Sequence, residues 1–338
     1  MTRILRTMLH DFRRLVQIWA QVVCAKNTFG ISLHDRLRAL FMGGFTPDQY
    51  VLFDLKRNDP KNYLSQLEVI RTRAINSPFK QIINNPIVCK EVLGHYLDVQ
   101  RVYARIAGDG KFISNGSEVR QPSDLDKLLN ERGMIVFRKT RGVKQRIIRK
   151  TGDIIAFENG PSFSTWSWLK WLHGWYILEP IPSHGYAENF GTDQLVTIKI
   201  ITFRDVANDR WKVCYALHRI PFGDATLISR IDLASGELSS ALDAETKKVY
   251  ASHPVTAALI EGTYVPHWQD VKENLMRASE QFPFLCYLVY TIVITESSFM
   301  VVNAKTSTEL TTAQLWEGQR QQELGKFFEA RGLLKPKK

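Results

Sequence analysis

Three polar residues, Thr291, Asn303 and Lys305, lie in a pattern that predicts a β-hairpin. The runs 287–295 and 299–303 are rich in β-branched and aromatic residues, and a short Glu-Ser-Ser turn joins them. If the turn is centred on its middle residue, antiparallel pairing places Thr291 opposite Asn303, and opposed residues project from the same face of a sheet. Lys305 follows two residues later and shares that face. The face therefore offers two neutral polar side chains and one cation.

A second group of polar residues precedes this hairpin. The apolar run 195–202 predicts a strand on which Thr197 and Lys199 face the same way, so that the pair can act together on an anion. The two strands expected next carry Arg219 and Arg230, which could face the same cleft. Alternatively, 195–202 is a half-exposed edge strand whose polar residues have no function. Both interpretations, anion binding and a plain edge strand, stay open.

Basic residues are concentrated between residues 138 and 150, where seven of thirteen are Lys or Arg. They begin at the end of a short apolar strand expected at 134–139. Because Gly142 is the one glycine of the loop that follows, we expect Arg141 and its neighbours to bind phosphate by side-chain charge rather than by successive backbone N–H groups. A strand edge protected by charge is the alternative. Nucleic-acid binding is a weaker hypothesis, because the run has no interleaved aromatic residues for base stacking.

The composition is that of a globular protein with anionic partners. Of 338 residues, 44% are hydrophobic, which supports a well-buried core. The formal net charge of +11 and the pI near 9.4 favour nucleotide phosphates, nucleic acid or an anionic membrane surface as partners. Four widely spaced cysteines without a CxxC pair indicate neither a disulfide framework nor a zinc site. Charged residues interrupt the N-terminal apolar run, so we expect a cytoplasmic protein.

Several helices are expected to position these residues. Residues 3–25 carry apolar positions at intervals of three and four with basic residues between them, which predicts an amphipathic helix. This helix either docks on the protein itself or lies on the inner face of the membrane. Thr46 before a proline predicts the N-terminus of a second helix. Trp168, Trp171 and Trp175 fall at helical spacing and predict a helix that packs under a small lobe, with sugar stacking or membrane insertion as alternatives.

In sequence order, these features resemble the landmarks of an ATP-grasp domain, in particular those of the sugar-transfer-associated ATP-grasp family. The likeness covers roughly residues 43–318. The landmarks are the segment 43–55, Lys90 after Cys89, Lys139 at a strand end, the hinge-like run 176–181 with Glu179, His184, the strand 195–202, the turn 232–236, His253-Pro254, Pro266-His267-Trp268 and the hairpin described above. The chain departs from the family pattern where an acidic residue is expected at Cys89, Thr291 and Asn303.

The resemblance implies an α+β fold in which two lobes enclose a nucleotide cleft, with a helical extension at the N-terminus. The expected division is 1–42 for the extension, 43–120 for the first part of the ATP-grasp region, 121–178 for the lid lobe, 179–332 for the C-terminal lobe and 333–338 for a basic tail. The resemblance also implies ATP contacts for Lys90, Lys139, Arg141, Glu179 and Thr197, and catalytic roles for Lys199, Arg219 and Lys305. The family's magnesium positions correspond to Thr291, Asn303 and Lys305, so a metal site is not expected there.

Two function classes follow from the resemblance. The first is an ATP-dependent ligase of surface-polysaccharide or sugar-conjugate biosynthesis, which joins a carboxylate to an amine or hydroxyl through an acyl phosphate. Its metal ligands would have moved to Asp224, Asp232 or Glu309, or Lys305 would occupy the cation's place. The second is a catalytically inactive descendant that binds a nucleotide, a sugar nucleotide or a partner enzyme.

Overall fold

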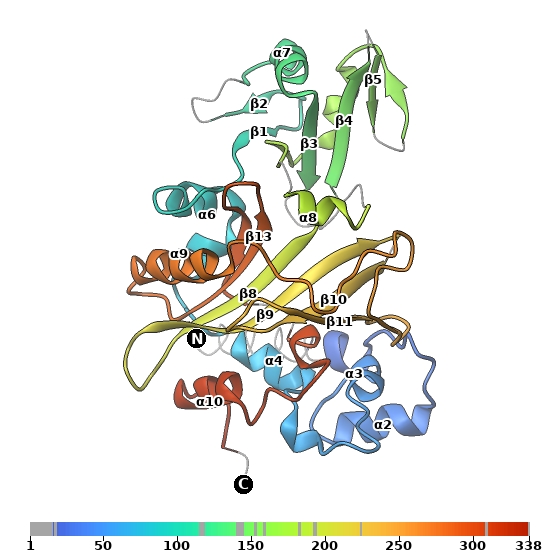
Figure 1. The fold of residues 1–338 in the computed structure, drawn as a ribbon, viewed down its shortest axis with the longest axis vertical. Coiled ribbons are helices and arrows are strands. Elements are labelled where there is room, and N and C mark those ends of the chain that lie inside the picture. Colours follow the sequence, from blue (N-terminus) through green and yellow to red (C-terminus); the bar gives the residue numbers. More distant parts are fainter. Residues whose placement is uncertain are drawn as a thin grey trace, which may run out of the picture.

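The larger of the two sheets in this computed structural model forms the centre of the molecule, as Figure 1 shows. The structure describes residues 16, 19–114, 119–139, 145–151, 154–157, 160–181, 184–191, 195–223, 225–307 and 310–336. The second, smaller lobe lies at one end of the molecule, and the helices of the N-terminal region lie at the other end. The predicted α+β class with two lobes is confirmed.

The larger sheet is antiparallel and has the strand order β12-β11-β10-β9-β8-β13-β14. Its strands are β8 (Thr197–Arg204), β9 (Trp211–Phe222), β10 (Ala225–Ile231), β11 (Leu238–Asp243), β12 (Val249–Tyr250), β13 (Tyr287–Ile294) and β14 (Phe299–Lys305). The predicted hairpin is β13 and β14, and Thr291 pairs with Asn303 as expected. A register shift follows between Thr291 and Ile292, which places a bulge next to this pair.

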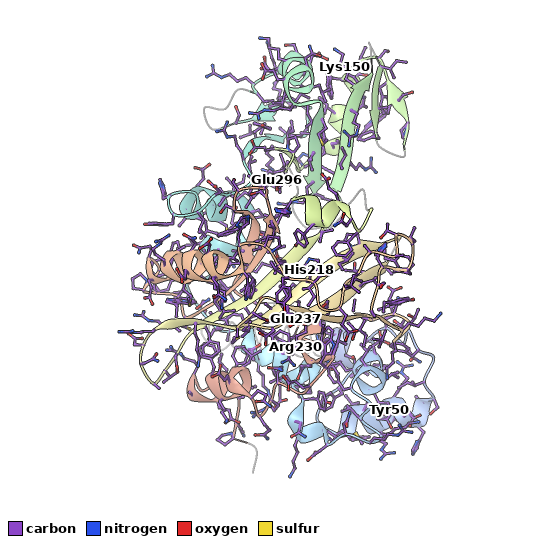
Figure 2. The ribbon with its side chains drawn as sticks, viewed as in Figure 1. Tyr50, Lys150, His218, Arg230, Glu237 and Glu296 are labelled. Atoms are coloured by element: carbon purple, nitrogen blue, oxygen red, sulfur yellow. The ribbon has the colours of Figure 1, made fainter. Side chains whose placement is uncertain are left out.

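Helices cover both faces of the larger sheet. One face packs against α5 (Lys80–Asn84), α6 (Pro86–Leu93), α8 (Gly185–Glu188) and α9 (Trp268–Glu280). The opposite face packs against α4 (Gln66–Thr72), η4 (Thr312–Gln314) and α10 (Glu323–Ala330). Successive strand residues alternate between the two apolar clusters, as Leu288 and Val289 do on β13. His218 and Arg230 lie on these opposite sides of the sheet (Figure 2).

The small lobe has a seven-stranded antiparallel sheet with the order β2-β1-β7-β3-β4-β5-β6. Its elements are β1 (Val102–Ile106), β2 (Phe112–Ile113), α7 (Pro122–Arg132), β3 (Met134–Lys139), β4 (Gln145–Thr151), β5 (Ile154–Phe157), β6 (Ser162–Phe163), η3 (Ser167–Leu172) and β7 (Trp175–Leu178). Two strands of this sheet precede residue 121, where we expected the lobe to begin. The division of the chain itself stays a prediction.

The tryptophan-rich segment differs from the helix that its spacing predicts. Trp168 is buried among Phe137, Phe157 and Phe163, as expected for a packing helix. The helix is a short 3₁₀ helix, however, and Trp175 already belongs to strand β7. Trp171 is exposed, so the three tryptophans do not share one face.

The N-terminal region consists of short helices that pack on one another. They are η1 (Trp19–Val23), α2 (Leu33–Phe41), α3 (Pro47–Leu52) and η2 (Pro60–Asn62). The predicted start of α3 is confirmed, because Thr46 and Gln49 form a reciprocal capping box. Most of the amphipathic helix predicted at 3–25 lies outside the described residues.

Candidate nucleotide site

Lys90 is the most buried charged group near the junction of the two lobes. Helix α6 begins at Asn85, whose Oδ1 accepts hydrogen bonds from the backbone N–H groups of Ile87 and Val88. One turn later, Lys90 is only 6% exposed. Its Nζ donates to Oε1 of the fully buried Gln100 at 3.1 Å. The helix cap thus sets the position of a lysine that is almost fully buried.

Gln100 connects Lys90 to the segment that returns from the small lobe. Its Nε2 donates to the carbonyl oxygen of Glu179 at 2.8 Å. The backbone N–H of Glu179 donates to the carbonyl of Arg101 at 3.0 Å, and the Arg101 N–H donates to Glu179 Oε2 at 3.4 Å. Glu179 therefore joins the two chain crossings between the sheets, which is the hinge position predicted for it.

Arg138 supplies a second cation beside Lys90. Burial lowers the pKa of Lys90 well below its usual value, and the positive charge of Arg138 lowers it further, while Cys89 and Glu179 act in the opposite direction. Burial also lowers the pKa of Arg138. We call Lys90, Gln100, Arg138 and Glu179 the hinge cluster. Lys90 is buried and Arg138 is half-buried, and their positive charges repel each other, so an anion bound between them would offset an electrostatic cost.

The alternation of strand β3 explains why Arg138 and not Lys139 faces the hinge cluster. Val136 belongs to a buried group that includes Ile87 of α6, so this face of β3 is directed toward the larger lobe. Arg138 shares that face because it lies two residues further along the strand. Lys139 is exposed at the strand end, and the role predicted for it remains untested. Arg141, the other contact predicted nearby, lies outside the described residues.

A cavity opens beside the hinge cluster. It has a volume of about 380 Å³ and is lined in part by Lys90, Gln100, Arg101 and Val102. The same chain segment runs next to strand β14, because the Gln100 N–H donates to the carbonyl of Val301 at 3.0 Å. Asn303 follows two residues later on β14. The hinge cluster and the β13–β14 hairpin therefore border one another.

The larger sheet brings several predicted residues together in register. Lys199 pairs with Thr291, and Thr291 pairs with Asn303. Lys199 also pairs with Leu217, which pairs with Arg230. One residue from each of five strands thus forms a line across the sheet, which we call the strand row: Arg230, Leu217, Lys199, Thr291 and Asn303. In the next register position on β8, Thr197 pairs with Arg219. Leu217 is in the apolar cluster that includes α4 and α10, which identifies the face of the row.

Most polar members of this face are half-buried rather than enclosed. Thr197, Lys199, Arg219 and Thr291 are all partly accessible, and Lys305 is exposed opposite Val289. Arg230 donates to Glu317 Oε1 at 3.1 Å. The structure therefore brings Lys199 next to Thr291 and Thr197 next to Arg219. It places Lys305 at the outer end of the same face.

The strand row does not suit magnesium. Mg²⁺ is usually held by one or two carboxylates, whereas Thr291 and Asn303 are neutral and Lys199 lies directly opposite Thr291. Across the part of the chain that the structure describes, no group of three or more His, Cys, Asp or Glu residues could hold a metal. Asp232, proposed above as an alternative ligand, accepts hydrogen bonds at Oδ1 from the backbone of Ala234 and Ser235 and caps a turn. Asp224 and Glu309 lie outside the described residues.

Gln100 and Arg138 are site residues that the sequence reasoning missed. Arg138 alternates with Val136 and Met134 on a strand whose other face buries Ile135 and Phe137, and this pattern could have assigned it to the cleft side. Gln100 gives no comparable signal, because it lies in a segment without regular periodicity. Its role depends on a hydrogen bond to Glu179, which is 79 residues away in the chain.

Comparison with protein families found one match, in the C-terminal part of the chain. Residues 173–325 match the model of the sugar-transfer associated ATP-grasp family. The matched range includes Glu179 and all of β8 to β14. The resemblance found in the sequence is confirmed over this range. A search of curated proteins found no match.

Several solved structures align with most of this chain at low identity. N5-carboxyaminoimidazole ribonucleotide synthetase from Thermotoga maritima is 12% identical, with 68% of this chain and 44% of that chain covered and a TM-score of 0.36. The synthase from Aspergillus clavatus, solved with ADP and 5-aminoimidazole ribonucleotide, is 11% identical, with 69% and 46% covered and a TM-score of 0.38. The ligase PsnB with precursor peptide PsnA2 and AMPPNP is 12% identical, with 90% and 66% covered and a TM-score of 0.35. The chain thus spans less than half the length of the two synthetases.

Proposed function

We propose that this protein binds ATP between its two lobes and that side-chain cations, rather than carboxylate-held magnesium, neutralise the phosphates. The observation that carries the proposal is the burial of Lys90 beside Arg138, with Gln100 and Glu179 as its polar surroundings. A buried lysine beside a half-buried arginine is costly without an anion, and a polyphosphate supplies one. The family match over 173–325 makes ATP the natural candidate.

The same arrangement supports ligase chemistry as the function of the bound nucleotide. In an ATP-grasp ligase a carboxylate attacks the γ-phosphorus, the bond to ADP breaks, and the acyl phosphate then reacts with an amine or hydroxyl. Negative charge develops on the transferred group and must be stabilised by nearby cations. Lys199 and Arg219 lie on adjacent strands of the larger sheet, and Lys305 lies at the edge of the same face. The family resemblance assigns these three residues to that role, in a cytoplasmic reaction that modifies a sugar or glycan intermediate. They lie on the sheet face that packs against α4 and α10, whereas α6 with Lys90 packs against the opposite face, so ATP would have to reach them around the edge of the sheet.

A non-catalytic function is the second candidate, and the missing carboxylates of the strand row favour it. Such a descendant would keep the hinge cluster to bind a nucleotide, a sugar nucleotide or a partner enzyme. The two candidates share the nucleotide site and differ in whether ADP is released. Binding of nucleic acid through the 138–150 run stays a separate prediction, to be tested by retention on DNA or RNA at low salt.

Calorimetric titration with ATP and ADP, each with magnesium and with EDTA, tests the shared part. We expect micromolar to submillimolar binding whose affinity changes by less than about threefold between the two conditions, since protein cations replace the metal. Release of ADP on addition of candidate acids and amines would identify the ligase. Absence of binding at millimolar ATP, or binding only with magnesium, would contradict the proposal.

A further inference from the structure

Helix α2 exposes its large apolar side chains and buries a small one. Leu33, Leu37 and Phe41 are 70%, 46% and 84% exposed, whereas the buried residue of the helix is Ala39. The three exposed residues are spaced by four, so they lie along one side of the helix. We call them the α2 stripe. A surface helix normally directs such a stripe into the core, and α2 does the opposite.

Hydrogen bonds and packing hold the inner side of α2 against the protein, so the α2 stripe cannot turn into the protein's own core. Asp35 accepts a hydrogen bond from the Tyr50 hydroxyl at 3.2 Å and pairs with Lys56 at 3.3 Å. Ser32 caps the helix by accepting from the Asp35 N–H, and Ala39 packs in a cluster with Phe45 and Tyr50. Tyr50 lies among these helices, at the end of the molecule opposite the small lobe (Figure 2).

The region around the stripe is strongly basic. In the described residues 19–42 there are three basic residues, Lys26, Arg36 and Arg38, and one acidic residue, Asp35. Arg38 is exposed next to Leu37 on α2, and Lys26 is exposed before the helix. Asp35 is directed inward to Tyr50 and Lys56. The outward side of α2 thus combines large apolar groups with cations and has its carboxylate turned away.

We propose that the α2 stripe docks on an anionic lipid surface. Leu33, Leu37 and Phe41 would enter the boundary between headgroups and acyl chains, and Arg38 and Lys26 would contact lipid phosphates. Charge complementarity selects this occupant, because a basic rim around an apolar stripe matches a negatively charged bilayer. None of the helices in the described part of the chain is long and apolar enough to cross a membrane, so the contact is peripheral. The small lobe lies at the end of the molecule opposite the docked helix (Figure 1).

Sedimentation of the full-length protein with vesicles tests this surface. We expect binding to phosphatidylcholine vesicles that contain phosphatidylglycerol, weaker binding as salt rises, and little binding to phosphatidylcholine alone. The variant Leu37→Gln/Phe41→Gln should lose at least about tenfold in vesicle affinity, because two apolar side chains no longer enter the interface. The matched control Val249→Gln/Val255→Gln removes apolar groups that are 62% and 74% exposed elsewhere, and its affinity should be unchanged.

Three outcomes would overturn the proposal. The first is absence of wild-type binding to the anionic vesicles at low salt. The second is equal vesicle binding by the wild type and the Leu37→Gln/Phe41→Gln variant, with circular dichroism showing that both are folded. The third is a sedimentation-equilibrium result in which that variant dissociates a dimer without any change in vesicle binding, which would assign the α2 stripe to a second copy of the chain.

Discussion

Around Lys90 the candidate site is buried and linked by hydrogen bonds, whereas around Thr291 it is half-exposed and has no carboxylates. In the hinge cluster, buried hydrogen bonds link Lys90 through Gln100 to Glu179, and Arg138 lies within electrostatic range. In the strand row, Thr291 and Asn303 keep their cross-strand register but carry no charge. Backbone geometry and side-chain chemistry can therefore be retained separately, and the two ends of this site show both cases.

The difference has a physical reason. Hairpin register depends on backbone hydrogen bonds and on the alternation of buried side chains, so β13 and β14 keep it whichever polar residue occupies position 291. A half-exposed threonine costs little free energy and needs no ligand. A buried lysine beside an arginine is costly in the unliganded protein. Its presence indicates a function that offsets the cost, and we therefore place the nucleotide phosphates nearer to the hinge cluster than to the strand row.

The largest expected effect comes from removing the buried lysine. Lys90→Met should lower ATP affinity about 100-fold, because it removes a charge-assisted contact in a site that excludes water. The folded protein should be as stable as the wild type or more stable, since an apolar group replaces a buried cation. Calorimetric titration and urea unfolding measure the two quantities. Loss of binding together with a large loss of stability would indicate a structural role instead.

The pH dependence of binding sharpens this test. Because the pKa of Lys90 lies well below its ordinary value, the unliganded lysine loses its proton at a lower pH than an exposed lysine does. ATP affinity should therefore fall as pH rises above the lowered pKa, and Lys90→Arg should flatten that fall because arginine stays protonated. A wild-type profile that is flat from pH 6 to pH 10 would contradict the role given to Lys90.

A smaller effect should separate two neighbouring cations on β3. Arg138→Met should lower ATP affinity about tenfold, while Lys139→Met should change it less than about threefold, because only Arg138 faces the hinge cluster. Each variant is the matched control for the other, since both remove one positive charge within the same strand. If Lys139→Met has the larger effect, the family-based assignment of Lys139 is right and our placement of the phosphates must move toward the strand end.

The sequence alone was sufficient for the hairpin and the capping of α3. These depend on local patterns: β-branched runs around a short turn, and Thr46 before Pro47. It also placed Lys90 and Glu179 in one site, although only through the resemblance to a known family. Periodicity by itself would not have joined two residues that are 89 positions apart.

The rest could not be predicted because it depends on contacts between distant segments. Lys90 is notable because Gln100 and Arg138 surround it, and no local pattern shows that a lysine will be buried. The prediction that Trp168, Trp171 and Trp175 lie on one helix was wrong for a related reason. Residues 167–172 form a short 3₁₀ helix before the chain enters β7, so the 3.6-residue period does not extend to Trp175.

The smallest expected effect is also the most direct test of the strand row. The triple variant Thr291→Asp/Asn303→Glu/Lys305→Asn places two carboxylates on paired strands and removes a cation, so ATP should bind up to about tenfold more tightly with magnesium than with EDTA. The matched control Thr291→Asn/Asn303→Gln/Lys305→Asn has similar side chains without the carboxylates and should show no such gain.

Lys199 complicates this variant in an informative way. It lies directly opposite position 291, so the new aspartate can pair with it instead of with the metal. Adding Lys199→Met to the triple variant should then increase the magnesium dependence further. If neither variant gains magnesium-dependent binding while both remain folded, the paired positions 291 and 303 are not the place where this fold would hold a metal beside ATP. The strand row would then be a structural feature of the sheet, and the hinge cluster would remain as the anion site.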